Sequence, residues 1–454
     1  MSTLFFEWAL LPEGWRPNVR ITQRNGRIDQ ITPHSARQNG DGGGGIALPG
    51  MASLHSHSFQ RGMAGLAEVR GPAGDSFWTW RQVMYRFLDV LDASDVEAIA
   101  AYAFMDMLEG GFTSVGEFHY LHHDVAGAPY ANPAEHCERI AAAAAATGIG
   151  LTLLPVFYAH GGFGGLPPTH GQRRFISTPD SFLKLAEGAR RAVAALPGAQ
   201  VGIAPHSLRA ATPDELAEVV TATPAGPIHI HIAEQTKEVD DCLAWSGARP
   251  VDWLMDHANV GERWCLIHAT HLSAGEVRRI AASGAVAGLC PLTESNLGDG
   301  VFSGPDFLAQ GGRFGVGTDS NIEITAAGEL KQFEYSQRLL LRARNVLAPR
   351  EGASTGQALY QAAATGGAQA MQRPCSALAV GQMADMVVLD AGHPDLAAAT
   401  PERFVDAYVF VAGKAAIKDV YVQGQHVVQQ GRHPLREAVS RRYVETLRRI
   451  TATL

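Results

Sequence analysis

The sequence predicts an α/β protein built as a (β/α)8 TIM barrel, with a small β-sandwich domain formed from both chain ends. Two observations carry this prediction. Eight short apolar runs in the middle of the chain end at polar residues, and helix-like stretches separate most of them. A β-rich pattern at the N-terminus also returns near the C-terminus. We expect residues 1–49 and 376–454 to form the composite small domain and residues 50–375 the barrel.

The two ends of the chain share the pattern of short strands joined by turns. Asn25-Gly26 stands between two alternating runs, where both residues tolerate the positive φ of a tight hairpin. A similar pattern returns in MADMVVLD and IKDVYVQGQHVVQQGRHP. Pairing of the two ends, with the barrel inserted between them, is an inference from this repetition.

Eight apolar runs are the expected barrel strands. They are residues 46–57, 113–120, 151–158, 201–207, 227–234, 265–269, 285–290 and 314–320. Two of the helix-like stretches between them, SFLKLAEGARRAVAAL and SAGEVRRIAASG, follow the helix-start signals Pro-Asp and Leu-Ser. A doubly wound open sheet has the same alternation of strands and helices, so the pattern alone leaves that fold open.

The polar residues at the strand ends favour the barrel. Six of the expected strands end in His55 and His57, His119 and Tyr120, His206, His231, His268 and Asp319. In a parallel barrel the carboxyl ends of all strands meet on one face. An open sheet rarely brings six separated strand ends to one point.

Composition narrows the class of protein. The chain has 454 residues, of which 46% are hydrophobic and 18% charged, and its net charge of −8 speaks against nucleic acid or an anionic membrane as partner. No uncharged run approaches the length that spans a membrane. Five widely spaced cysteines without a CxxC pair favour reduced thiols in a cytoplasmic protein. The N-terminal segment lacks the basic leader of a signal peptide.

Histidines and acids at the strand ends have the spacing of a metal site. His55 and His57 lie two apart on a strand and face the same side, although an isolated HxH is more often a packing pair. His231 ends a strand three residues before Glu234, which suits a metal ligand beside a carboxylate that transfers protons. His229 is the alternative ligand on that strand. We interpret it as a core histidine one layer below.

His268 and Asp319 complete the set. Each closes an apolar strand, and each alone is a weak signal, since a histidine there is often a core group and GTDS reads as a turn. The order HxH, HxxE, H and D, with each element at a different strand end, is specific.

This combination resembles the amidohydrolase superfamily, in its deaminase branch, over essentially the whole chain. The resemblance implies that one metal is bound by His55, His57, His231 and Asp319. It also implies that Glu234 and His268 move protons and orient water, and that Asp319 accepts the proton of the water. Other members bridge two metals with a lysine or an acid near strand 4, but residues 201–207 contain neither. We therefore expect one divalent metal per chain, with Zn²⁺ favoured over iron or manganese.

Two arginines suggest an acidic substrate. A deaminase substrate has a carbon that bears a leaving nitrogen and is attacked by a metal-activated hydroxide. Arginine captures carboxylates in a bidentate manner, which a neutral nucleobase does not require. Arg209 lies three residues from His206 at the expected barrel mouth, which favours a functional role. For Arg81, a substrate contact and an ordinary surface ion pair are evenly balanced.

Longer strings narrow the resemblance. LHSHSFQRGMAGLAE, DSFWTWRQ, HIHIAEQTKEVDDC and ESNLGDG resemble the bacterial N-formimidoyl-L-glutamate deiminases of histidine degradation. The resemblance implies conversion of N-formimidoyl-L-glutamate and water to N-formyl-L-glutamate and ammonia by a homodimer. It also implies that the substrate is contacted by Gln60, Arg81, Tyr120, His206 and Arg209.

The chain departs from this family at a few positions. Asn321 stands where we expect a histidine, and Pro291 and Ser295 replace other small residues. We expect these changes to border the substrate mouth. A deaminase of another carboxylated amidine, or of a nucleobase, is therefore the alternative function. A barrel that serves only as a non-catalytic scaffold is disfavoured, because every expected ligand and Glu234 are present.

Overall fold

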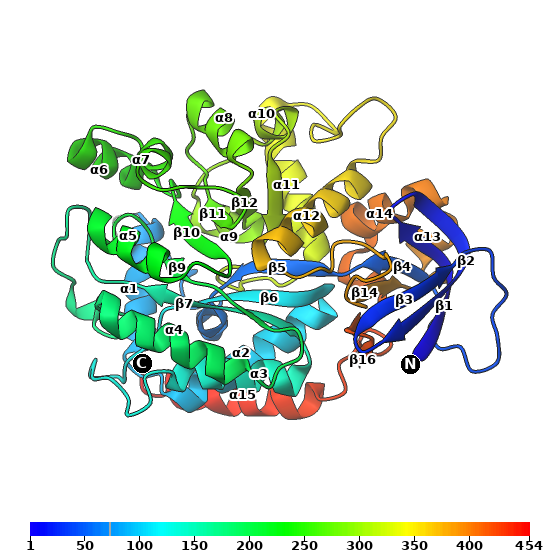
Figure 1. Cartoon of the computed structure of the whole chain (residues 1–454), viewed down its shortest axis with the longest axis horizontal. Helices are drawn as coiled ribbons and strands as arrows, with labels where there is room; N and C mark the ends of the chain where they lie inside the picture. Colours follow the sequence, from blue (N-terminus) through cyan, green and yellow to red (C-terminus); the bar gives the residue numbers. More distant parts are fainter. Residues whose placement is uncertain (72–73) are drawn as a thin grey trace.

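The two predicted groups of strands form two separate β structures. The computed structural model describes residues 1–71 and 74–454. In this part of the chain, parallel strands surrounded by helices form a barrel, and a smaller sheet beside it contains strands from both chain ends (Figure 1). The predicted fold, a (β/α)8 barrel with a small β domain made from both ends, is confirmed.

The barrel consists of two runs of parallel strands that join at both sides. The strands are β5 (Met51–Ser56), β6 (Phe112–His119), β7 (Gly150–Phe157), β8 (Gln200–Val201), β9 (Ala204–Pro205), β10 (Ile228–Ile232), β11 (Trp264–His268), β12 (Val286–Leu289) and β13 (Arg313–Val316). A bridge between Ser207 and His231 connects the first run to the second. A bridge between Ser56 and Asp319 returns the second run to β5 and closes the barrel.

Two of the predicted barrel strands are divided. The run 46–57 is interrupted at Gly50, whose N–H donates to the Asp385 carbonyl 2.9 Å away. Its first part, β4 (Ile46–Pro49), joins the small sheet, and only its second part enters the barrel. The run 201–207 is likewise interrupted between β8 and β9, where the N–H of Gly202 bonds to Leu153 and that of Ile203 to Pro227.

Helices cover the outside of the barrel. They include α1 (Phe77–Leu88), α2 (Ala93–Glu109), α3 (Glu135–Thr147), α4 (Pro179–Val193), α5 (Pro213–Ala222), α6 (Thr236–Ser246), α7 (Pro250–His257), α8 (Ala274–Ser283), α9 (Pro291–Leu297), α10 (Gly304–Ala309) and α11 (Ala326–Leu341). Side-chain caps define several starts: Ser273 caps α8 as predicted, whereas α4 starts before the predicted Pro-Asp, at a Thr178 cap.

Helix α12 (Thr355–Met371) covers the end of the barrel opposite the polar strand ends. Its residues Ala370 and Met371 pack in one buried cluster with Leu54, Cys265 and other interior side chains. The ring of His229 hydrogen-bonds to the Ala370 carbonyl across 2.8 Å. The barrel is thus filled from this side, and the polar strand ends lie on the open side.

The small sheet has the strand order β16-β15-β14-β4-β1-β2-β3. Its remaining strands are β1 (Ser2–Leu11), β2 (Gly14–Arg24), β3 (Arg27–Thr32), β14 (Met386–Leu389), β15 (Ile417–Val422) and β16 (Gln425–Val428). The predicted hairpin joins β2 to β3, with φ of 51° at Asn25 and 76° at Gly26. β4 is the central link, because it pairs in parallel with β1 and antiparallel with β14.

The last helix leaves this sheet and returns to the barrel. α15 (Arg436–Thr451) lies along α2 (Figure 1), where the Tyr443 ring stacks on Tyr102 with 4.0 Å between centroids. Arg442 and Arg449 form ion pairs with acids near the start of α2. The end of the chain thus packs on the barrel. The predicted limit between the two domains at residue 376 stays a prediction.

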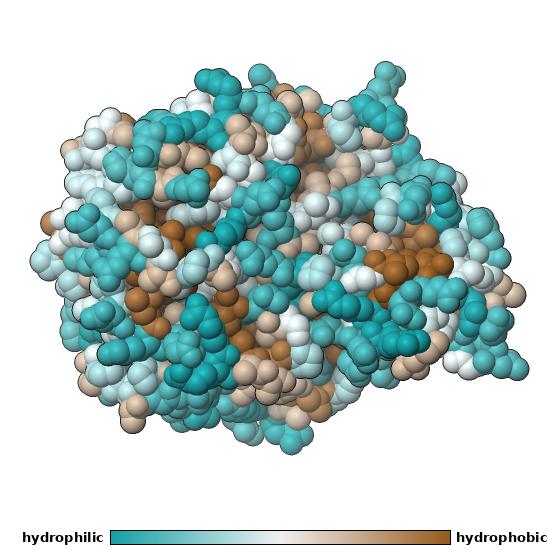
Figure 2. Space-filling model, viewed as in Figure 1, coloured by the Kyte–Doolittle hydropathy of each residue, from teal (hydrophilic) through white to brown (hydrophobic). Residues whose placement is uncertain are grey.

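The surface seen in Figure 2 alternates hydrophilic residues with separate hydrophobic patches. Within residues 1–71 and 74–454, no helix combines the length and the apolar character needed to cross a membrane. All five cysteines are buried and free, as the sequence predicts.

The close packing of α12 on the barrel gives a test of the fold. A Cβ at Gly366 would overlap the Phe314 carbonyl, so Gly366→Ala must push α12 away from β13. We expect it to lower the free energy of unfolding by about 1–3 kcal/mol, as overpacking usually does. Chemical denaturation measures this, with the exposed neighbour substitution Thr365→Ala as control. Equal midpoints for Gly366→Ala and the parent chain would contradict the packing.

Candidate functional site

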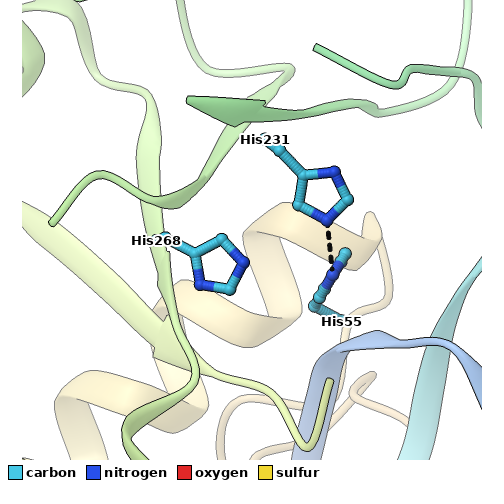
Figure 3. Close-up of side chains that lie close together, drawn as sticks. All are labelled: His55, His231 and His268. Carbon is cyan, nitrogen blue, oxygen red and sulfur yellow. Dashed lines mark hydrogen bonds between the residues drawn. The ribbon is translucent and has the colours of Figure 1, made fainter. Parts of the chain in front are cut away.

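Histidine rings from separate strand ends converge on the open side of the barrel. The rings of His55, His231 and His268 face one another (Figure 3), and the Nε2 atoms of His55 and His231 are 3.0 Å apart. Asp319 Oδ1 lies 3.5 Å from His55 Nε2 and 3.3 Å from His57 Nε2. His55 thus belongs to two close groups of ligand atoms, one with His57 and Asp319 and one with His231 and His268.

These distances fit one tetrahedral metal ion. Two ligand atoms bound at about 2.0–2.1 Å with a tetrahedral angle are separated by about 3.3–3.4 Å. The separations of the pairs His55–His231, His55–Asp319 and His57–Asp319 are 3.0, 3.5 and 3.3 Å and fall around that value. Three nitrogens and one oxygen are also a donor set that suits zinc and related divalent ions.

Backbone carbonyls orient two of the rings. The Nδ1–H of His57 donates to the Phe118 carbonyl across 2.8 Å, and that of His231 donates to the His206 carbonyl across 3.0 Å. These bonds leave the Nε2 lone pairs directed at the site. Burial lowers the pKa of His55 to about 3 and also lowers the pKa of His57. The rings are therefore neutral at pH 7, as metal ligands must be.

The strand ends adopt unusual backbone angles at the site. Asp319 has φ of 42° and His268 has φ of 67°, both in the left-handed region that few non-glycine residues occupy. Such conformations persist where the surrounding structure fixes them, and they cluster at functional sites. Here they turn the two side chains toward the histidines as the strands end.

Glu234 and His268 are a close pair of titratable groups beside His55 and Asp319. His268 Nε2 lies 3.8 Å from Glu234 Oε1 and 3.8 Å from Asp319 Oδ2. Burial raises the pKa of Glu234 to about 7. Burial also lowers the pKa of His268, but the carboxylates of Glu234 and Glu294 outweigh it and raise this pKa to about 10. At pH 7 the pair therefore contains a proton donor and a carboxyl group that readily exchanges protons.

Two acids at this site were not predicted. Glu294 Oε1 lies 3.2 Å from His268 Nδ1 and also accepts the Cys290 N–H. Asp299 lies near Glu234 and His268, and burial raises its pKa to about 9. The sequence contains one signal that could have indicated Glu294: it stands in the first turn of a helix directly after the seventh barrel strand.

The pocket at the open end of the barrel brings together the residues that the sequence predicts to contact the substrate. It is lined by Gln60, Arg81, Tyr120, His206 and Arg209, together with Glu234, His268 and aromatic side chains that include Phe77, Trp80, Tyr85 and Tyr158. Gln60 Nε2 donates to the Tyr120 hydroxyl across 2.7 Å. Phe77, Trp80 and Tyr85 lie on α1, and Tyr158 directly follows β7. The aromatic-rich segment around Arg81 is evident in the sequence, but its place in the pocket was not predicted.

Arg81 and Arg209 lie beside the same aromatic ring. The Arg81 guanidinium lies 4.7 Å from the centre of the Trp78 ring, and that of Arg209 lies 5.9 Å from it. Among the residues that the structure describes, neither buried Nε atom has a hydrogen-bond partner. Both guanidinium groups therefore keep hydrogen-bond donors free for an anion in the pocket.

The expected position of the family departures was wrong. Asn321 is fully buried behind His57 and Asp319 and does not line the pocket. Pro291 is the first residue of α9, and Ser295 lies on the exposed side of that helix. Asn321 lies outside the pocket because its amide is bonded inside the barrel wall to the carbonyls of His57 and Asp319.

Comparisons with known proteins agree with this geometry. The model of the amidohydrolase family matches residues 46–427, and that of the N-terminal domain of formimidoylglutamate deiminase HutF matches residues 1–45. A curated formimidoylglutamate deiminase from Pseudomonas aeruginosa is 50% identical over 98% of this chain and 99% of its own length. A 5-methylthioadenosine/S-adenosylhomocysteine deaminase from Natronomonas pharaonis is 25% identical, covering 86% of this chain and 83% of its own.

Solved structures show the same fold. An amidohydrolase from Brucella melitensis superposes with a TM-score of 0.96 at 52% identity, covering 99% of this chain and 100% of its own. An adenosine deaminase from Xanthomonas campestris with bound zinc gives 0.81 at 18% identity, covering 99% and 98% of the two chains, and shows the fold alone. The chain belongs to the amidohydrolase family, and within it to the formimidoylglutamate deiminases.

Proposed function

We propose that this chain hydrolyses N-formimidoyl-L-glutamate to N-formyl-L-glutamate and ammonia, a reaction of histidine degradation. The observation that carries the proposal is a single pocket with the proton-exchanging Glu234 at its base and the unpaired guanidinium groups of Arg81 and Arg209 in its walls. The substrate needs both, because it carries an amidine carbon and two carboxylates. The 50% identity to a curated enzyme of this name supports it.

Deamination of a nucleobase is the alternative that the arginines disfavour. Several curated relatives at 24–27% identity are named as deaminases of purine compounds. A neutral ring would leave two guanidinium groups in the pocket without an anionic partner. A dicarboxylate satisfies both, since each guanidinium can hold one carboxylate in a bidentate pair.

We propose that His55, His57, His231 and Asp319 hold one divalent metal, with zinc favoured. The neutral rings, the fixed Nε2 lone pairs and the ligand spacing support this assignment. When bound, such an ion supplies a Lewis acid that lowers the pKa of water from about 15.7 to about 7.

The protein side chains perform the proton transfers. Hydrolysis breaks the bond from the amidine carbon to its terminal nitrogen and forms a C=O bond, and both water protons pass to the nitrogen that leaves as ammonia. Asp319 accepts a proton from the attacking water, and Glu234 delivers protons to the nitrogen, since its pKa of about 7 allows it to bind and release them. The protonated His268 stabilises the attacking oxygen. Gln60, Tyr120 and His206 position the amidine.

The homodimer and the cytoplasmic location expected from the sequence stay predictions. Size-exclusion chromatography with light scattering measures the first. Ammonia release from N-formimidoyl-L-glutamate, measured on the purified protein together with its metal content, tests the proposed reaction. Metal without ammonia release would leave the hydrolase fold intact and refute this substrate.

Substitution of the two histidines on β10 tests the metal site. We expect His231→Ala to lose most bound metal, because a ligand is removed. The matched variant His229→Ala is expected to retain about one metal per chain, since the His229 ring bonds to the Ala370 carbonyl in the lower layer of the barrel. Elemental analysis of both purified proteins distinguishes them. Equal metal content in the two would refute the assignment of His231.

Glu234→Gln tests proton transfer. The amide keeps the shape of the side chain but cannot shuttle protons, so we expect kcat to fall by about 10²- to 10⁴-fold with unchanged metal content. Steady-state kinetics and elemental analysis on the same sample measure both quantities. Activity equal to the parent enzyme would remove Glu234 from its proposed role.

Arg209→Met tests recognition of the substrate carboxylates. Loss of a charge-assisted pair worth about 1.5–3 kcal/mol is expected to raise KM for N-formimidoyl-L-glutamate by about 10- to 100-fold, with metal content unchanged. Arg190→Met on the surface of α4 is the matched control. Parent-like KM in Arg209→Met would favour the nucleobase alternative.

A further inference from the structure

The barrel closes where the end of β5 lies beside the segment after β13, and we call this junction of residues 55–57 and 318–321 the seam. It contains three of the four proposed metal ligands. β5 leads into His55 and His57, and Asp319 follows β13. The N–H of His57 donates to the Asp319 carbonyl across 2.9 Å, and that of Asp319 donates to the His55 carbonyl across 3.0 Å. The ligand separations across this seam therefore depend on how firmly the two strand ends are held together.

Asn321 bonds to both sides of the seam. Its Nδ2 lies 2.9 Å from the Asp319 carbonyl, 3.2 Å from the His57 carbonyl and 3.2 Å from Ser56 Oγ. Its Oδ1 accepts the Thr318 hydroxyl across 2.7 Å, which fixes the orientation of the amide. The side chain is fully buried, so none of these bonds competes with solvent.

The backbone of Asn321 is suited to this place. Its φ of 58° lies in the left-handed region, which asparagine adopts more readily than most residues. The Arg61 guanidinium, which is paired with Asp106 of α2, donates to the Asn321 carbonyl across 2.7 Å. The turn after Asp319 is thus held from inside by an amide and from outside by an arginine.

We infer that Asn321 is a positioning residue that sets the spacing of His57 and Asp319 for the metal. His57 is then fixed at both ends, because Phe118 holds its ring and Asn321 holds its carbonyl. An imidazole at position 321 cannot reproduce this set, because each of its ring nitrogens offers at most one N–H. The inference rests on the proposed metal site and is independent of the substrate.

Zinc affinity of the purified full chain tests the inference. Asn321→Gly removes the amide but tolerates the positive φ, and partners that orient metal ligands are typically worth 10- to 100-fold in affinity. We expect zinc, measured by competition with a chromophoric chelator, to bind about 10- to 100-fold more weakly. Asn345→Gly, at an exposed asparagine with φ of 52°, is the matched control and should bind zinc like the parent chain.

A second readout separates positioning from simple loss of stability. We expect the rise in melting temperature on adding zinc to be smaller in Asn321→Gly than in the parent, because weaker binding stabilises the folded state less. The inference would be overturned if Asn321→Gly bound zinc with the affinity of the parent chain and its melting temperature fell equally with and without zinc. If Asn321→Gly cannot be purified, Thr318→Val releases the amide oxygen and should weaken zinc binding at least threefold. Unchanged affinity there would also overturn it.

Discussion

The closure of the parallel barrel is the constraint on which the rest of the site depends. The bridge between Ser56 and Asp319 joins the first strand to the last and sets the Nε2 atoms of His55 and His57 within 3.5 Å of Asp319 Oδ1. The ligands come from positions more than 260 residues apart in the chain. Helix α12 fills the opposite end of the barrel, so the polar strand ends are the side on which a pocket can form.

Burial divides the titratable groups of the site into two kinds. The histidines that face the proposed metal position lose their charge, because desolvation disfavours imidazolium. His268 keeps its charge, because two carboxylates flank it. Histidine thus supplies both the neutral rings proposed to bind the metal and the protonated ring of His268 beside them. Hydrolysis of an amidine requires both.

The two arginines of the pocket, Arg81 and Arg209, keep their positive charge beside an aromatic ring. Among the described residues no acid forms an ion pair with Arg81 or Arg209, and the Trp78 ring lies close to both. Glu238 and Glu234 are near enough to Arg209 to favour its charged form. The aromatic residues of α1 therefore prepare the pocket for an anion. The structure also explains why substitutions near Pro291 and Asn321 need not alter the substrate, because neither residue reaches the pocket.

The sequence by itself determined the fold class, the pairing of the two chain ends and the family, because strand periodicity and the polar residues at strand ends are local signals. The site residues predicted from the sequence do lie together at the open end of the barrel. Their roles stay predictions. The tertiary structure decided what depends on contacts across the barrel. Glu294 is positioned by His268, Asn321 lies beneath the ligands, β4 leaves the barrel at Gly50, and α15 packs on α2. The physical reason is that the partners in each contact lie far apart in the chain, and burial and hydrogen bonding between them exist only after the barrel has closed.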